Sequence, residues 1–320
     1  MCTICTLRTL RTLCTLCTLC TLAPIKSPQR MTPPDHEAFF RFGQRPFSLT
    51  PDPRFYFRSR SHGRVFDSLS SAIARRENLM LVIGDLGVGK TTLCRTLIES
   101  QERKVRSALV GNALLSPEDL LRLMLQDLGA VPGRDARDGR LLSLTRAELV
   151  REFDAFLHDL DRAKAGAVLI IDEAHSLPPA TLEQILDIAH LDSNRGKVLQ
   201  FLLAGQPGAA GVATPRFTDD RLAVRARLLP LERDECERYI HHRLTIAGGA
   251  PVTFSTPAIE LIYSLSGGLP RLVNLLSERG LQEAASAHSN RIEASMIDSA
   301  ASALDLLRIR PKRFRWYGTR

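Results

Sequence analysis

A glycine-rich segment carries the clearest chemical signal in this chain of 320 residues. It follows the apolar run Leu79 to Ile83 and fits the phosphate-binding loop pattern from Gly84 to Thr91. Glycines let backbone N–H groups turn towards a phosphate, and the start of a helix adds positive potential. We predict that Lys90 reaches the outer phosphates and that the Thr91 hydroxyl binds Mg²⁺. The predicted nucleotide contacts are Gly84, Asp85, Leu86, Gly87, Val88, Gly89, Lys90, Thr91 and Thr92.

Two acids follow a second apolar run, Val168 to Ile171, in the arrangement known as Walker B. Asp172 at a strand end beside the loop could hold Mg²⁺ through its coordination shell, while Glu173 could orient and polarise an attacking water. With Ala174 and His175 these acids also spell the DEAH sequence of one helicase class, but the later motifs of those helicases are missing. The pair therefore predicts a metal ligand and a catalytic base for phosphoryl transfer.

Two more polar residues are placed to contact a nucleotide. Gln206 closes the predicted strand that begins at Leu199, and strand ends line the ligand crevice in parallel sheets. It could contact the γ-phosphate or the attacking water, or it could belong to a structural turn. Arg271 falls in the first turn of a predicted helix, where a cation is electrostatically unfavourable. We therefore expect an anionic partner for Arg271, and the nucleotide is the obvious one.

A pair of arginines suggests a contribution to a second subunit. Arg221 and Arg225 are four residues apart, which places both on one side of a helix if this segment is helical, as we predict. An arginine inserted into a neighbouring subunit's triphosphate site accelerates hydrolysis by about 10³ to 10⁵. The alternative is a solvated basic face.

Apolar runs alternate with helical patterns, which predicts a parallel sheet covered by helices on both faces. After Pro230 we predict no strand and a small all-helical second domain. The predicted strands are 79–83, 107–110, 167–171 and 199–203. The predicted helices are 65–76, 91–100, 117–128, 145–162, 179–189, 232–247, 257–265, 270–287 and 293–306.

The net charge of +8 suggests nucleic-acid binding until the charges are located. Residues 1–30 and 308–320 together carry ten cations and no acid, so the rest of the chain is slightly acidic. No apolar run approaches the roughly 18 to 20 residues that a spanning helix needs. Only Cys94 and Cys236 lie beyond the first 20 residues, which favours a reducing, cytoplasmic compartment. Any DNA binding is expected to be weak and to depend on the basic tail.

The sequence divides into five predicted parts. Residues 1–30 are a low-complexity leader of Cys-Thr-Leu and Arg-Thr-Leu triplets, expected to lie upstream of a start at Met31; a zinc site and a transit peptide are the alternatives. An aromatic and proline-rich arm follows. The parts after the leader are the arm (31–64), a P-loop core (65–230), a helical lid (231–307) and a basic tail (308–320).

These motifs together resemble the AAA+ ATPases, and more narrowly the ExeA/GspA-like secretion ATPases. The resemblance spans about residues 37–305. It rests on Pro46 to Phe55, Ser61-His62, Gly84 to Arg95, Leu203 to Pro207, Tyr239 to Leu244 and Ser266 to Asn274.

The resemblance implies a parallel-sheet AAA+ sandwich with a smaller helical lid, ATP and Mg²⁺ as ligands, and a homo-oligomer. It implies that Gln206 is sensor 1, that Arg271 is sensor 2, and that Arg221 or Arg225 is the arginine finger. It also implies that the arm up to His62 lies near the adenine. Members of the narrower group continue into a membrane helix and a peptidoglycan-binding domain, whereas this sequence ends at Arg320. We therefore expect any membrane contact to come through a partner protein.

Three functions remain open from the sequence. The first is an ATPase that assembles or remodels a protein complex in secretion, the envelope or polysaccharide export. The second is a DNA-associated ATPase of the MuB/TniB transposition-helper type, to which the tail Arg308 to Tyr317 could contribute phosphate contacts and base stacking. The third is a nucleotide-dependent switch that hydrolyses ATP slowly.

Overall fold

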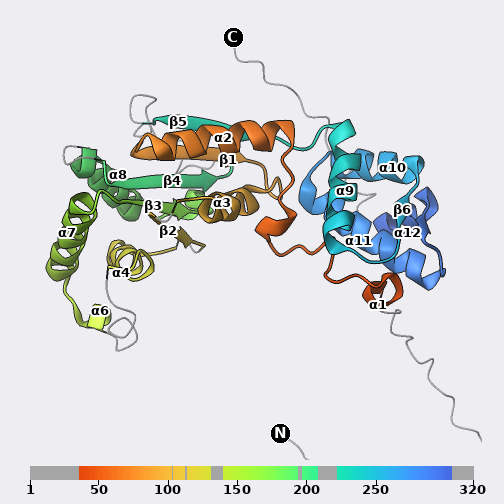
Figure 1. Ribbon diagram of the computed structural model, residues 1–320, viewed down its shortest axis with the longest axis horizontal. Helices are drawn as coiled ribbons and strands as arrows, with labels where there is room; N and C mark the ends of the chain where they lie inside the picture. The colour runs from red at the N-terminus through yellow and green to blue at the C-terminus, as the bar shows by residue number, and fades with distance from the viewer. Residues whose placement is uncertain are drawn as a thin grey trace, which may run out of the picture.

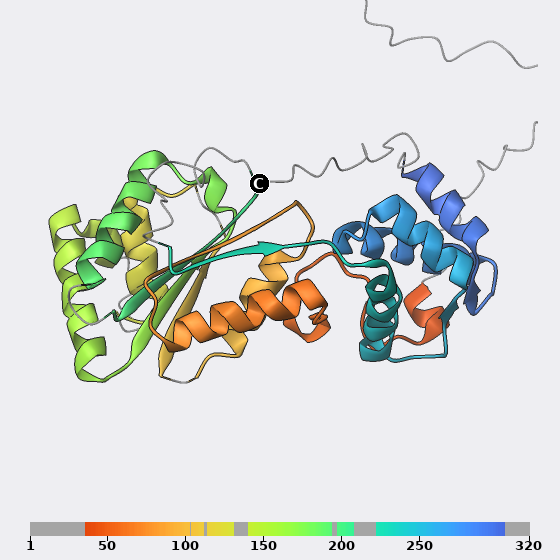
Figure 2. The same ribbon diagram turned by 90° about the horizontal axis from the view of Figure 1, so that it is seen from above.

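The computed structural model describes residues 36–102, 104–111, 114–130, 140–193, 197–207 and 222–304. These residues form two lobes joined by extended segments: a sheet lobe with its helices and a helical lobe (Figures 1 and 2). The predicted leader, the basic tail and Arg221 lie outside the described residues. None of the described helices is long and apolar enough to cross a bilayer.

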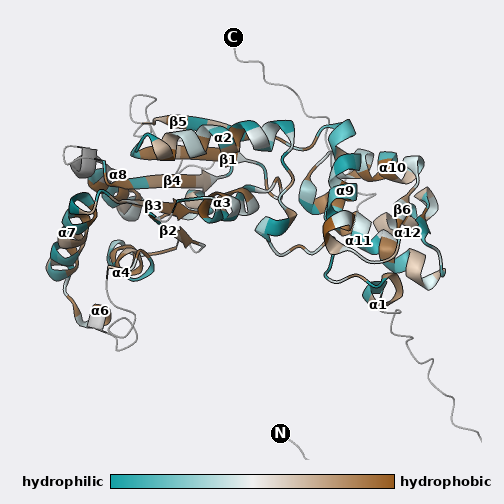
Figure 3. Ribbon diagram, in the orientation of Figure 1, coloured by the Kyte–Doolittle hydropathy of each residue, from teal (hydrophilic) through white to brown (hydrophobic). Residues whose placement is uncertain are grey.

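The sheet lobe is built on five parallel strands in the order β2-β3-β4-β1-β5. Strands β3 and β4 are buried along their whole length, as their almost entirely apolar sequences require. The buried polar side chain of β4, Gln200, donates to the carbonyls of Ile73 and Glu77. The central strands are accordingly mostly hydrophobic in Figure 3. The predicted parallel sheet is thus confirmed. The strands are β1 (Leu79–Gly84), β2 (Val105–Val110), β3 (Gly166–Ile171), β4 (Leu199–Gly205) and β5 (Val224–Leu228).

Helices cover both faces of this sheet, and each face has its own core. One core joins the sheet to α2 and α3, and the other joins it to α4, α7 and α8. Side-chain caps fix where two helices begin: Ser116 accepts the backbone N–H of Asp119, and Thr145 forms a capping box with Glu148. The helices are α2 (Arg60–Ala74), α3 (Lys90–Glu99), α4 (Pro117–Asp127), α6 (Arg140–Ser143), α7 (Arg146–Arg162) and α8 (Pro179–Ser193).

The helical lobe has a separate core to which the arm contributes. Phe40 and Phe47 from the arm are almost fully buried among the lobe's apolar residues. Beyond Phe47 the arm runs through the short 3₁₀ helix η1 (Pro53–Phe55) to α2, and so passes from one lobe to the other. The helices of this lobe are α1 (His36–Phe40), α9 (Arg233–Ala247), α10 (Thr256–Ser266), α11 (Pro270–Ser286) and α12 (Ala294–Ala303).

Three expectations about elements need correction. Two strands do follow Pro230: β6 (Thr253–Phe254) and β7 (Arg291–Ile292) pair in parallel, but at two residues each they are too short to show a period. Helix α2 begins at Arg60, inside the predicted arm, because Ser59 caps it. The boundaries proposed at residues 64 and 230 remain predictions.

The third correction concerns the arginine pair. Arg225 lies on strand β5, not on a helix, and pairs with Leu81 of β1. The segment alternates half-buried Val224 and Ala226 with exposed Arg225 and Arg227. This period of two is a strand signal, and the four-residue spacing to Arg221 concealed it.

Candidate functional site

The glycine-rich loop joins β1 to α3 in a conformation that requires its glycines. Gly87 and Gly89 have φ values of 79° and 108°, in the left-handed region. A Cβ on Gly84 would lie 2.8 Å from a methyl carbon of Val88, so the turn is too tight for a side chain there. The Lys90 side chain is buried, and its Nζ donates to the carbonyls of Gly84 at 2.9 Å and Asp85 at 3.1 Å. The loop thus holds an ammonium group at its centre.

Oxygen ligands for a divalent cation lie next to this loop. The Thr91 hydroxyl, in the first turn of α3, donates to a carboxylate oxygen of Asp172, which directly follows β3. Asp172 is 5% exposed. A hydroxyl and a carboxylate are hard oxygen donors of the kind that Mg²⁺ takes together with phosphate oxygens. The residues predicted to hold the metal therefore fit it in chemistry and in mutual position.

Glu173 adopts a backbone conformation that is unusual for a residue with a side chain, with φ 50° and ψ 37°. Such strain is concentrated at functional sites. Its Oε2 lies 3.2 Å from His175 Nδ1, and Gln206 Nε2 donates to the same oxygen at 3.4 Å. The structure therefore brings Gln206 and Glu173 together at neighbouring strand ends. His175 completes the group. In the sequence it was considered only as part of the rejected DEAH helicase motif.

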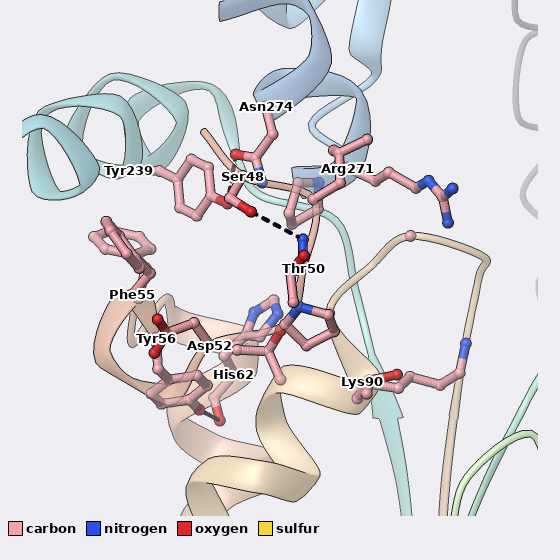
Figure 4. A pocket seen from close by; sticks show the side chains of 18 of the residues that line it. Ser48, Thr50, Asp52, Phe55, Tyr56, His62, Lys90, Tyr239, Arg271 and Asn274 are labelled. Carbon is pink, nitrogen blue, oxygen red and sulfur yellow. Dashed lines mark hydrogen bonds between the residues drawn. The ribbon is translucent and has the colours of Figure 1, made fainter. Parts of the chain in front are cut away.

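The loop forms one wall of an open cleft. The other walls come from the arm between Ser48 and Phe57 and from helices α9 and α11. Figure 4 shows Lys90 and Arg271 towards one end of this cleft, which we call the loop end. Phe55 and Tyr239 lie towards the other end, which we call the aromatic end. A cleft with one cationic and one aromatic end suits a nucleotide, which has a charged phosphate chain and an aromatic base.

Arg271 connects the helical lobe to the loop end. Its backbone N–H donates to the carbonyl of Gly87 at 3.1 Å. A Cβ on Gly87 would lie 2.8 Å from the Cβ of Arg271, so the glycine is also needed for this close approach. Arg271 therefore lies at the cleft, and its contact with a nucleotide remains a prediction. Arg225 is not among the described residues that line it.

The aromatic end contains a buried polar chain to which the sequence analysis assigned no role. Arg243 Nη1 donates to the Tyr239 hydroxyl at 2.8 Å, and that hydroxyl donates to Asn274 Oδ1 at 2.8 Å. The guanidinium also donates to the arm carbonyl of Ser48 and lies 4.6 Å from the Phe55 ring centre. These residues come from three separate segments. All three carry the family resemblance, but nothing in the sequence indicated that they meet.

Burial controls the protonation of two arm residues in this cleft. It lowers the pKa of His62, and the hydrogen bond to the carbonyl of Val88 only partly opposes that shift. Burial likewise raises the pKa of Tyr56. Both side chains are therefore neutral at pH 7.

Comparison with known proteins agrees with this geometry. Residues 73–212 match the family described as AAA domain. The chain therefore carries an AAA domain over these residues. It is 32% identical over 266 residues to General secretion pathway protein A of Aeromonas hydrophila, an alignment that covers 82% of this chain and 47% of that protein. The chain thus spans about half the length of the curated relative it matches.

Solved structures share the AAA+ fold at low sequence identity. Cdc6p from Pyrobaculum aerophilum superposes with a TM-score of 0.63 at 17% identity, covering 81% of this chain and 70% of that one. The Aeropyrum pernix ORC2 protein, solved as ADPNP–ADP complexes, gives 0.63 at 15% identity, with coverages of 81% and 71%. The predicted fold class is therefore confirmed.

Proposed function

We propose that the chain hydrolyses ATP with Mg²⁺. The observation that supports this most directly is that Lys90, Thr91 and the strained Glu173 line one cleft, with Asp172 hydrogen-bonded to Thr91. A glycine turn with a purely structural role would not require a buried lysine ammonium group, nor the two acids Asp172 and Glu173 next to it. The match of residues 73–212 to the AAA domain supports the same activity.

In the proposed reaction the oxygen of a water attacks the γ-phosphorus, and the bond from that phosphorus to the β–γ bridging oxygen breaks. Glu173 accepts the water proton, and ADP and inorganic phosphate leave. Lys90 and Arg271 lie where they can neutralise charge on the transferred group. Mg²⁺, when bound by Thr91 and Asp172, would supply charge neutralisation on the phosphate oxygens. Gln206 could orient the water or Glu173 from the next strand end.

Two variants test this proposal. Glu173→Gln should still bind ATP while phosphate release collapses, because only the base is lost. Lys90→Ala should lose binding, because the buried cation is removed. Equilibrium binding of a fluorescent ATP analogue and steady-state phosphate release measure the two effects separately. Phosphate release that is unchanged in Glu173→Gln would remove Glu173 from the mechanism, and tight ATP binding by an inert wild-type chain would favour the slow-switch function.

Oligomerisation is typical of AAA+ proteins, and we propose that this chain also forms a homo-oligomer with an arginine supplied between subunits. Arg225 is exposed on β5 and lines no part of its own cleft, so it is a candidate for that role. Mixing Arg225→Ala subunits with Glu173→Gln subunits should restore some activity. Specific activity that does not depend on protein concentration, with a monomer in ATP by light scattering, would contradict the proposal.

We further propose that ATP hydrolysis here drives assembly of a secretion or envelope complex from the cytoplasmic side. The support is the relative named General secretion pathway protein A, which aligns with most of this chain. The ATP-loaded Glu173→Gln chain should sediment with inner-membrane vesicles from its own host, and Lys90→Ala should not. Hydrolysis stimulated by DNA, with no such sedimentation, would favour the transposition-helper function.

A further inference from the structure

His62 lies in the first turn of α2 with its ring against the phosphate-binding loop (Figure 4). The residue is 5% exposed. Its Nε2 is 3.0 Å from the carbonyl oxygen of Val88, and its Nδ1 is 2.7 Å from the Ser59 hydroxyl. A Cβ on Gly89 would lie 3.1 Å from the same Nε2. The ring therefore contacts the peptide unit that joins Val88 to Gly89.

The partners of the ring fix which nitrogen carries the proton. A carbonyl oxygen can only accept, so Nε2 must be the N–H that donates to Val88. Nδ1 then accepts from the Ser59 hydroxyl, and the oxygen of that hydroxyl accepts the backbone N–H of His62 at 3.2 Å. Both ring nitrogens of His62 and the hydroxyl of Ser59 therefore have hydrogen-bond partners. The Ser59 hydroxyl thus supports the tautomer of His62 that donates to the loop.

The hydrogen bond to Val88 also sets the direction of the next N–H. A trans peptide is planar, and its C=O and N–H point in opposite directions. Because His62 holds the Val88 carbonyl towards α2, the Gly89 N–H must point away from α2. Among the described residues that N–H has no acceptor. It is therefore a donor held in place and left available to a ligand.

We propose that His62 is a positioning residue that presents the Gly89 N–H to a phosphate of a bound nucleoside di- or triphosphate. This inference rests on the proposed nucleotide site and adds the group that orients its loop. It differs from the sequence-based expectation, in which the arm up to His62 lies near the adenine. The ring acts on the phosphates through one peptide unit, and the base does not take part.

The dependence of affinity on phosphate tests this role. Dissociation constants for ADP, ATP and adenosine are measured by titration calorimetry for the wild type, His62→Leu and His62→Gln. His62→Leu removes the donor and should weaken ADP and ATP about tenfold, equivalent to about 1.4 kcal/mol, and leave adenosine within about twofold. His62→Gln keeps an amide N–H at similar reach and should restore ADP binding to within about threefold. His158→Leu, at an exposed histidine of α7, is the matched control and should change nothing.

The outcomes separate this inference from the alternatives. Equal weakening of adenosine and ADP would overturn it in favour of a contact with the base or a general effect on the fold. ADP affinity unchanged in His62→Leu would also overturn it. If His62→Leu does not fold, His62→Asn replaces it, because its shorter amide cannot reach Val88 and should lose phosphate affinity where Gln keeps it. Normal ADP binding by a wild-type chain that does not hydrolyse ATP would contradict the proposed function alone.

Discussion

The two ends of the cleft are assembled in different ways. The loop end uses short contiguous motifs at strand ends: Gly84 to Thr92 after β1, and Asp172 with Glu173 after β3. The aromatic end draws Phe55 from the arm, Tyr239 and Arg243 from α9 and Asn274 from α11. A contiguous motif survives changes in how the lobes pack, whereas the aromatic end exists only when arm and helical lobe are in place. We infer that the loop end binds the phosphates and carries out the chemistry, whereas the aromatic end contributes to affinity alone.

Arg271→Ala challenges this division most strongly, because the helical lobe supplies Arg271 to the loop end. We expect kcat to fall about 100-fold, the usual cost of removing a group that stabilises transition-state charge. ATP affinity should change much less. Steady-state phosphate release and direct binding separate the two quantities. Arg279→Ala, at an exposed arginine of the same helix, is the control. A loss confined to affinity would place Arg271 with the aromatic end.

Arg243→Met tests the aromatic end. The guanidinium is buried, donates to Tyr239 and the carbonyls of Pro46 and Ser48, and has no carboxylate within ion-pair distance among the described residues. Methionine leaves these acceptors without a donor, so the free energy of unfolding should fall by about 2 kcal/mol. ATP affinity should fall while kcat at saturating ATP stays near wild type.

Urea unfolding and ATP titration measure these effects. Arg238→Met, at an exposed position of α9, should stay within about 0.5 kcal/mol of the wild type. A large fall in kcat for Arg243→Met would show that the aromatic end takes part in the chemistry after all.

The same difference explains what the sequence could predict. The positions of the loop and of the two acids could be predicted, because glycines or acids directly after an apolar run indicate the end of a buried strand. The position of Gln206 at a strand end could be predicted for the same reason. An anionic partner for Arg271 was inferred because a cation in the first turn of a helix is electrostatically unfavourable. In the structure the Arg271 backbone N–H donates to the carbonyl of Gly87.

The rest depends on distant packing. The contact of His62 with Val88 joins residues 26 positions apart, and the contact of Arg243 with the arm joins residues nearly 200 apart. No local pattern announces either one. Arg225 was misplaced because a spacing of four puts two residues on one side of a helix and also on one face of a strand. The alternation of small apolar residues with arginines around Arg225 fits a strand, and the pairing of this segment with β1 shows that it is one.

The smallest expected effect is the pH dependence of stability due to His62. Burial holds its pKa in the folded chain below the ordinary value of 6.5, although the carboxylate of Glu235 opposes this shift. Above pH 6.5 the imidazole is neutral in both states, and its contribution to stability is complete. As the pH falls below 6.5, the unfolded chain takes up a proton that the folded chain resists, so stability declines until the folded pKa is passed. Urea midpoints at pH 7.5 and 5.5 should therefore differ less in His62→Gln than in the wild type. If the urea midpoint changed equally with pH in the two proteins, the imidazole would titrate freely in the folded chain, and Ser59 would not hold it neutral against the loop.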